Sequence, residues 1–257
     1  MSAAPARLAE LTWPEVAAAV AAGATTLILP LGATEQHGPH LPLGTDTLRA
    51  EELAARLAAL LPGALVAPAL PVGCSDEHAG FPGLLGLDAE TLAAVICDVA
   101  RRAAGWGVTR LVVLSAHGGN GAGPARAGER LRAELPGLAV WLPADLAAPL
   151  AGPRAVAAAD GVTPEAHGLH AGEGETSELL WLRPDLVRRE LAAPGYAGDM
   201  AAIMPTLRAV GLRPVTPSGV LGDPLGADAA RGERYLQAAA EGLAAAIADH
   251  FAAHAHG

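Results

Sequence analysis

Four short runs of apolar residues constrain the fold of this chain more than any other feature of its sequence. Each run is rich in Val, Ile or Leu, and apolar side chains occupy both of its faces, which is typical of parallel strands covered by helices on both sides. The four runs are Thr25–Leu31, Ala64–Val72, Arg110–Ser115 and Leu138–Leu142. We expect them to be the buried strands of a mostly parallel sheet.

Helical patterns separate these runs. We expect Thr12 to cap the first helix and either Asp46 or Thr45 to cap the second. The expected helices are Trp13–Ala22, Thr47–Leu61, Asp88–Trp106, Ala125–Leu135 and Asp228–Ala253. This alternation of strands and helices predicts an α/β fold, a three-layer α/β/α sandwich with right-handed crossovers, formed by residues 1–257 as a single domain. Two segments rich in turn residues, Ala147–Thr163 and Pro194–Pro224, are expected to be loops, the second of them folding over the active site.

The composition excludes several classes of function. No apolar run reaches the roughly 20 residues needed to span a bilayer, and the N-terminus lacks the pattern of a signal peptide, so we expect a cytoplasmic protein with no membrane partner. The net charge is −10 and the arginines are scattered, which argues against a nucleic-acid partner. The chain has no lysine, which excludes Schiff-base chemistry. Cys74 and Cys97 are expected to be free thiols, although a thiol nucleophile at Cys74 is conceivable.

Histidines and acids gather in loops, mostly directly after the predicted strands. The first loop carries Glu35 and His37, which alternate and therefore point the same way in an extended segment, and Asp46 follows before a helix. Imidazole and carboxylate ligands together suit Zn²⁺, Mn²⁺ or Fe²⁺. The other loops are Asp76–Gly83, His117–Asn120 and His167–Ser177. Each loop alone has a simpler structural explanation, such as a helix cap or a glycine turn. Because ligands bind beyond the carboxyl ends of parallel strands, their common placement favours one shared metal site.

The longest of these motifs runs from Leu31 to Asp46 and reads Leu-Gly-Ala-Thr-Glu-Gln-His-Gly-Pro-His-Leu-Pro-Leu-Gly-Thr-Asp. It resembles the signature of the creatininase family, the creatinine amidohydrolase-like proteins. Further motifs resemble the same family in the same order: Phe81-Pro82-Gly83, His117-Gly-Gly-Asn120, His170-Ala-Gly and Glu175-Thr-Ser.

This resemblance implies a three-layer α/β sandwich that binds two divalent metal ions and assembles into a homo-oligomer, often a hexamer. Glu35, Asp46 and His117 would hold one ion. His37 and Asp46 would hold the other, so that Asp46 bridges both. His170 matches the family histidine proposed to move protons during ring opening.

Two positions depart from true creatininases. Gly119 stands where they carry a glutamate that binds the second ion. Leu169 stands where they carry a glutamate just before the histidine of the His-Ala-Gly motif, which is His170 here. We expect Glu175, which lies just before a predicted helix, to supply the missing ligand and Glu173 to act in proton transfer; the reverse assignment stays open. Creatinine itself is expected to be a poor substrate.

The function expected from these residues is hydrolysis of a C–N bond in a small-molecule amide, formamide or lactam, rather than an ordinary peptide bond. Two divalent ions (Zn, Mn or Fe) would activate a water. His170 or Glu173 would pass its proton to the leaving nitrogen, and Asn120 would bind the developing oxyanion. Three alternatives stay open: a peptidase of mycofactocin-type peptide maturation, a ring hydrolase of a cyclic polyol ketone, and a non-catalytic binding or assembly protein with a partial metal site.

Overall fold

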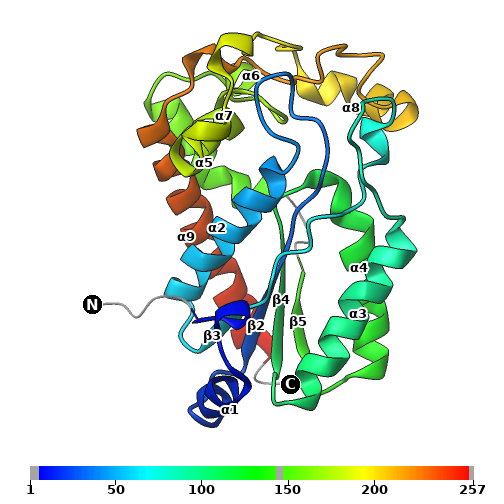
Figure 1. Ribbon diagram of the computed structural model, residues 1–257, viewed down its shortest axis with the longest axis vertical. Helices are drawn as coiled ribbons and strands as arrows, with labels where there is room; N and C mark the ends of the chain where they lie inside the picture. The colour runs from blue at the N-terminus through cyan, green and yellow to red at the C-terminus, as the bar shows by residue number, and fades with distance from the viewer. Residues whose placement is uncertain (1–5, 143–146, 255–257) are drawn as a thin grey trace.

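A five-stranded parallel sheet forms the centre of the molecule (Figure 1). The computed structural model describes residues 6–142 and 147–254. Within them the strand order is β1-β3-β2-β4-β5, and every pairing is parallel. The strands are β1 (Ala6–Arg7), β2 (Thr26–Leu31), β3 (Ala64–Val66), β4 (Arg110–Ser115) and β5 (Ala139–Trp141). The prediction of an α/β fold around a parallel sheet is therefore confirmed.

The strand β3 is shorter than the apolar run that predicted it. Pro68 and Pro71 lie in the second half of that run, and a proline has no N–H to donate to a neighbouring strand. Leu70 lies between them and still donates its N–H to Pro30 O at 2.9 Å. The chain therefore continues beside β2 as an irregular segment after Val66.

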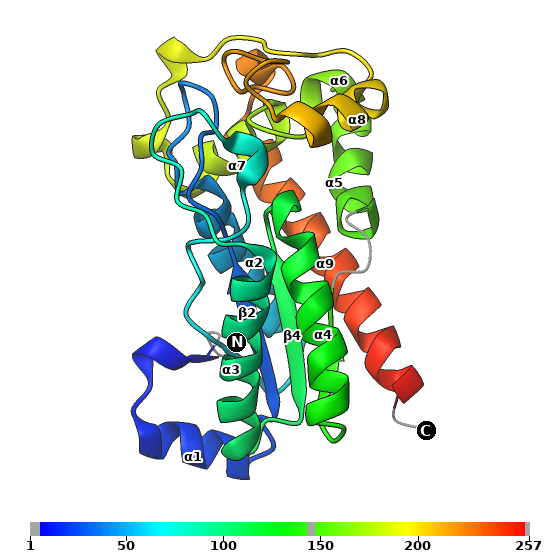
Figure 2. The same cartoon turned by 90° about the vertical axis from the view of Figure 1, so that its right-hand side faces the viewer.

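Helices cover both faces of the sheet, as Figures 1 and 2 show. One face packs against α3 (Ala89–Gly105) and α4 (Ala122–Glu134) through Ile96 and Leu131. The other face packs against α2 (Thr45–Leu60) and α9 (Ala229–His254) through Leu57 and Ile247. In β4, Leu111 faces the first of these cores and Val112 the second, so alternate residues of the strand serve the two layers.

The short helix α1 (Trp13–Ala21) precedes β2 and lies at the end of the sheet where the strands begin (Figure 1). It starts as predicted: the backbone N–H and the hydroxyl of Thr12 both donate to the Glu15 carboxylate. The second expected cap is wrong. Gly44 occupies the N-cap of α2, so Thr45 and Asp46 lie in its first turn. Asp46 is thereby free of capping and can direct its carboxylate elsewhere.

Helices also occupy the two segments that were expected to be loops. The helix α5 (Ala147–Ala159) occupies most of the first segment, and α8 (Met200–Val210) occupies part of the second. Together with α6 (Pro164–His167) and α7 (Glu173–Leu182), which lie between the two segments, they cover the end of the sheet where the strands terminate (Figure 1). The loop expected over Ala147–Thr163 is wrong because alanine favours helix and because α5 packs closely on α9. Gly152 makes this approach possible: a Cβ there would lie 2.8 Å from Ala238 O.

Short 3-10 turns join these elements, at Leu8–Glu10, Asp76–His78, Gly118–Gly121, Pro184–Leu186, Arg189–Leu191 and Pro224–Gly226. Cys74 and Cys97 are free thiols, as expected. No helix in the described ranges is both long enough and apolar enough to cross a membrane.

Candidate metal centre

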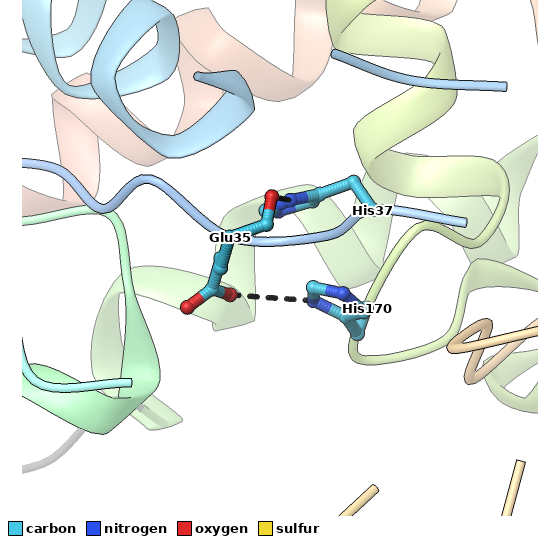
Figure 3. A group of neighbouring side chains, drawn as sticks. All are labelled: Glu35, His37 and His170. Carbon is cyan, nitrogen blue, oxygen red and sulfur yellow. Dashed lines mark hydrogen bonds and ion pairs between the residues drawn. The ribbon is translucent and has the colours of Figure 1, made fainter. Parts of the chain in front are cut away.

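The His/acid loops meet beyond the carboxyl ends of β2, β3 and β4. Glu35 and His37 follow β2 and are fully buried, with 0% of their surface exposed. Figure 3 shows the Glu35 carboxylate pointing toward the ring of His170, whose Nδ1 lies 3.9 Å from Glu35 Oε1. His37 Nδ1 lies 3.3 Å from Glu35 O, two residues earlier in the chain, and donates its proton to that carbonyl. The other ring nitrogen, Nε2, is therefore the atom that would bind an ion once it is deprotonated.

Two groups of side chains have the composition and spacing of a metal site, and they share Asp46. In the first group, His117 Nδ1 lies 3.3 Å from Asp46 Oδ2, and His117 Nε2 lies 3.2 Å from Glu35 Oε2. In the second, His37 Nε2 lies 3.3 Å from Asp46 Oδ1 and 3.7 Å from Glu175 Oε2. Asp46 thus presents one oxygen to each group, the arrangement that a bridging carboxylate requires.

Several polar atoms of these residues are buried without a hydrogen-bond partner, which suits a site for a divalent cation. Both carboxylate oxygens of Glu35, Nε2 of His37 and Oδ2 of Asp46 are buried and make no hydrogen bond. A buried polar atom without a partner is costly, and native proteins rarely keep several together without an ion, water or ligand. The donors are carboxylate oxygens and imidazole nitrogens, the set that Zn²⁺ and Mn²⁺ accept.

The charges of the cluster compensate one another without an ion. Burial raises the pKa of Glu35 to about 8. Burial alone would lower the pKa values of the two histidines, but the surrounding carboxylates, Asp46 foremost, outweigh it and raise them, to about 9 for His37 and about 10 for His117. Burial acts to raise the pKa of Asp46, and His37 and His117 overcome it, so that this pKa lies well below its ordinary value. These shifts favour protons on the atoms that a cation would need, so protons and cations would compete for the cluster.

Arg49 supports the second group from α2. Its Nη1 lies 2.6 Å from Glu175 Oε1, and the other oxygen of Glu175 accepts the N–H of Ala171 at 2.7 Å. Arg49 also donates from Nε to Glu178 and from Nη1 to Ala116 O, at 3.2 Å for the latter. The direction of the Glu175 carboxylate is thereby fixed, with Oε2 facing His37.

His170 lies between the two groups and lines the cavity next to them. Its Nε2 lies 2.7 Å from Gln36 O and donates to it, which leaves Nδ1 facing Glu35 and His37. Burial, followed by the nearby His37, lowers the pKa of His170 to about 3. The ring is therefore neutral near pH 7, with one fixed donor and one free lone pair.

Two residues expected to act in catalysis are engaged in other hydrogen bonds. Glu173 Oε1 accepts from Ser177 Oγ and from Arg231 Nε, both at 2.7 Å, and Oε2 accepts from Tyr235 Oη at 2.8 Å. Glu173 is only 1% exposed and belongs to none of the candidate metal groups among the described residues. The geometry therefore gives no support to its expected role in proton transfer.

Asn120 is also engaged. Its Oδ1 accepts the N–H of Cys74 at 2.8 Å, and its Nδ2 donates to Gly32 O at 3.0 Å and to Ser115 Oγ at 3.2 Å. These bonds join the segments that follow β2, β3 and β4, so Asn120 braces the loops of the centre. An oxyanion would have to displace them to reach the amide.

Glu77, His78 and Arg49 also reach the cluster. The sequence pointed to the Asp76–His78 loop only as another possible source of a ligand, and it gave Arg49 no role. His78 Nε2 lies 3.0 Å from Glu35 Oε1, and Glu77 Oε1 lies 3.4 Å from His117 Nε2. The rule that placed the other ligands also covers these two, because their loop follows the second predicted strand. Arg49 had a weaker signal: it is a charged residue one turn after Asp46 on the same helix.

A cavity of about 810 Å³ opens beside the cluster. His117, His170 and Glu175 form part of its wall. The remaining wall is largely apolar and includes Leu53, Leu114, Trp141, Leu207 and Leu243. Trp141, which ends β5, is thus part of the cavity wall as well as of the sheet.

Comparison with known proteins identifies the family of this chain. Residues 9–247 match the family model described as Creatininase, creatinine amidohydrolase. The chain belongs to the creatininase family. A solved creatinine amidohydrolase (creatininase) superposes with a TM-score of 0.77 at 31% identity, over 95% of this chain and 97% of that one. Another, described as creatininase Mn, gives 0.75 at 30% identity, over 95% and 98%.

Curated relatives in the creatininase family carry two kinds of name. The mycofactocin precursor peptide peptidase of Mycobacterium ulcerans (strain Agy99) is 37% identical over 233 residues, which is 88% of this chain and 81% of that protein. The creatinine amidohydrolase of Pseudomonas putida is 42% identical over 113 residues, only 42% of this chain and 43% of that protein. Both names describe hydrolases.

Proposed function

We propose that this creatininase-family protein is a metal-dependent hydrolase that cleaves a peptide C–N bond in a small precursor peptide of the mycofactocin type. The observation that carries this choice is sequence similarity over most of the chain: the curated peptidase is 37% identical over 88% of this chain, the solved creatininase is 31% identical over 95%, and the curated creatinine amidohydrolase aligns over only 42%. The sequence favoured a non-peptide amide and left the peptidase open as an alternative. A peptide bond is an amide, so the same chemistry serves both.

The cavity supports a peptide substrate. Creatinine is a small planar ring, whereas a cavity of about 810 Å³ is in the range that holds ligands of drug size. Leu53, Trp141 and Leu207 supply apolar surface on which hydrophobic side chains of a peptide would be buried. Asp46 and His117 also line this cavity, so a peptide bound there would have its reacting bond beside the cluster.

The centre would hold two divalent ions, with Zn²⁺ and Mn²⁺ as the first candidates. Glu35, Asp46 and His117 would hold one, and His37, Asp46 and Glu175 the other. Solved relatives described as creatininase Mn and as a variant creatininase of Zn–Zn type support these metals. Bound divalent ions would supply Lewis acidity, polarising the scissile carbonyl and lowering the pKa of a water.

The chain's own residues would position and move protons around that bond. His170 is fixed by its bond to Gln36 O, and its free Nδ1 faces the cluster from the cavity wall. From there it would accept a proton and return it to the departing amine nitrogen. Arg49 would keep Glu175 directed at His37 throughout.

The test compares substrates on one metal-loaded protein. We expect a synthetic mycofactocin precursor peptide to be cleaved in the presence of Mn²⁺ or Zn²⁺, measured by liquid chromatography and mass spectrometry. Creatinine should show a kcat/KM more than tenfold below the roughly 10⁴ M⁻¹s⁻¹ at the lower end for enzymes acting on their own substrates. If creatinine, a formamide or a lactam is hydrolysed while the precursor peptide is not cleaved, the protein is instead a hydrolase of small amides. Two bound ions with no turnover of any substrate would indicate a binding protein.

A further inference from the structure

Glu77 brings a third carboxylate to the Glu35 side of the centre. It lies in the turn after β3, and its Oε1 is 3.4 Å from His117 Nε2. Ligand atoms of Glu35, Glu77 and His78 all lie within 4.8 Å of one another. Glu35 is fully buried, and neither of its carboxylate oxygens accepts a hydrogen bond, so both are available to bind an ion.

The local backbone makes room for the Glu77 side chain. A Cβ on Gly119 would lie 2.3 Å from Glu77 Oε1, 2.3 Å from Cys74 O and 2.4 Å from His117 Nε2. Any side chain at position 119 would therefore overlap the place that the Glu77 carboxylate occupies. The backbone of Glu77 is held from the other side, where Leu212 N donates to Glu77 O at 2.8 Å.

The Glu77 carboxylate has few competing partners. Glu175 is held by Arg49, and Glu173 by Arg231. Within residues 6–142 and 147–254, the contact shown for the Glu77 carboxylate is with His117, itself a candidate ligand. The side chain is 30% exposed and lines the cavity, so its oxygens can turn toward an ion without breaking an arginine pair.

We propose that Glu77 is an additional metal ligand, which binds the ion held by Glu35, Asp46 and His117. The proposal rests on the metal centre of the proposed function. A carboxylate oxygen is a suitable donor for either Zn²⁺ or Mn²⁺, and four protein ligands would hold this ion more firmly than three. Gly119 is then explained as the residue that leaves space for the Glu77 carboxylate.

The experiment measures metal binding rather than turnover. Glu77→Gln keeps the size of the side chain and removes its charge, and Glu77→Ala removes the carboxylate entirely. The matched control is Asp76→Asn, which neutralises the exposed acid next to Glu77 in the same turn. Among the described residues, Asp76 belongs to no candidate metal group. Zn²⁺ and Mn²⁺ affinities are measured by chelator competition, ion content by mass spectrometry, and the ligand field by visible absorption of the Co²⁺-loaded full chain.

We expect both Glu77 variants to weaken the binding of one ion by at least about tenfold, the lower end of the effect of losing a supporting group near a metal. Their Co²⁺ spectra should change, while Asp76→Asn keeps the affinities and spectrum of the unmodified chain. Unchanged affinities and spectra in Glu77→Gln would overturn the proposal, even if Glu77→Ala fails to fold. An unmodified chain that binds no divalent ion would overturn it together with the metal centre. Two tightly bound ions without peptide cleavage would refute the proposed function alone.

Discussion

Asp46 is the residue on which the two metal groups depend, because each of its oxygens faces a different histidine. Oδ1 lies 3.3 Å from His37 Nε2, and Oδ2 lies 3.3 Å from His117 Nδ1. We expect Asp46→Ala to abolish the binding of both ions, whereas Glu35→Ala should remove mainly one. Metal content per chain, measured after dialysis, distinguishes the two variants. Two ions retained by Asp46→Ala would refute a bridging role.

The raised pKa values of Glu35, His37 and His117 predict how pH affects the metal-free protein. They rise from 4.5, 6.5 and 6.5 to about 8, 9 and 10, so the folded chain binds these protons more tightly than the unfolded chain does. Their stabilisation is complete below the unfolded pKa values and is lost as pH rises through the folded ones. The lowered pKa of Asp46 acts in the opposite sense, but only as pH falls below 3.8.

Metal binding requires these groups to be deprotonated, so its stabilisation grows over the same range of pH. We therefore expect the difference in Tm between metal-loaded and chelator-treated protein to widen from pH 6.5 to pH 9, the ordinary and folded values for His37. Differential scanning fluorimetry in matched buffers measures this difference. A gap that narrows with rising pH would contradict the assignment of these residues as ligands.

At the scale of elements, one side chain joins three of the segments that carry the candidate ligands. Arg49 on α2 contacts Glu175 and Glu178 on α7 and the carbonyl of Ala116 after β4. Removing one partner of a buried ion pair leaves an uncompensated charge, which costs about 3–5 kcal/mol. We expect Arg49→Gln to lower the free energy of unfolding by about 3 kcal/mol, measured by urea denaturation of the metal-free protein.

The control for Arg49 is Arg126 on α4, which pairs with Glu90 at 3.0 Å and whose side chain is 47% exposed. Exposed ion pairs contribute less than about 1 kcal/mol, so Arg126→Gln should have a correspondingly small effect. Arg49→Lys should fall between the two, because lysine keeps the charge and loses the forked geometry. Equal losses at the two arginines would contradict the linking role of Arg49.

At the scale of the whole molecule, the two cores hold the sheet and the ligand loops are attached to its end. Leu111 in β4 is fully buried in the core against α3 and α4. We expect Leu111→Ala to cost about 2–5 kcal/mol of unfolding free energy, while metal content per folded chain stays unchanged. Urea denaturation and metal analysis test the two parts. The control Leu225→Ala, at a side chain that is 64% exposed, should change neither.

Some features could be predicted from the sequence because they depend on residues close together in the chain. Continuous apolar runs predicted the strands β2 and β4, and the loops after them were predicted to carry Glu35, His37, Asp46 and His117. The structure brings these four side chains together. Composition misled in the alanine-rich segment 147–163, where glycine and proline suggested a loop but packing against α9 stabilises α5.

Which acids face the cluster was decided only by the tertiary structure. Glu175 was expected to be the ligand and Glu173 a proton-transfer residue, but both were placed before the predicted helix, where the reverse assignment stayed open. Both lie in the first turn of α7, where each residue turns by about 100°, so two residues apart point to nearly opposite sides. Glu175 therefore faces His37, and Glu173 faces Arg231 and Tyr235. Local pattern thus determined the strands and the first ligands, and the rotation of a helix packed on its neighbours decided the rest.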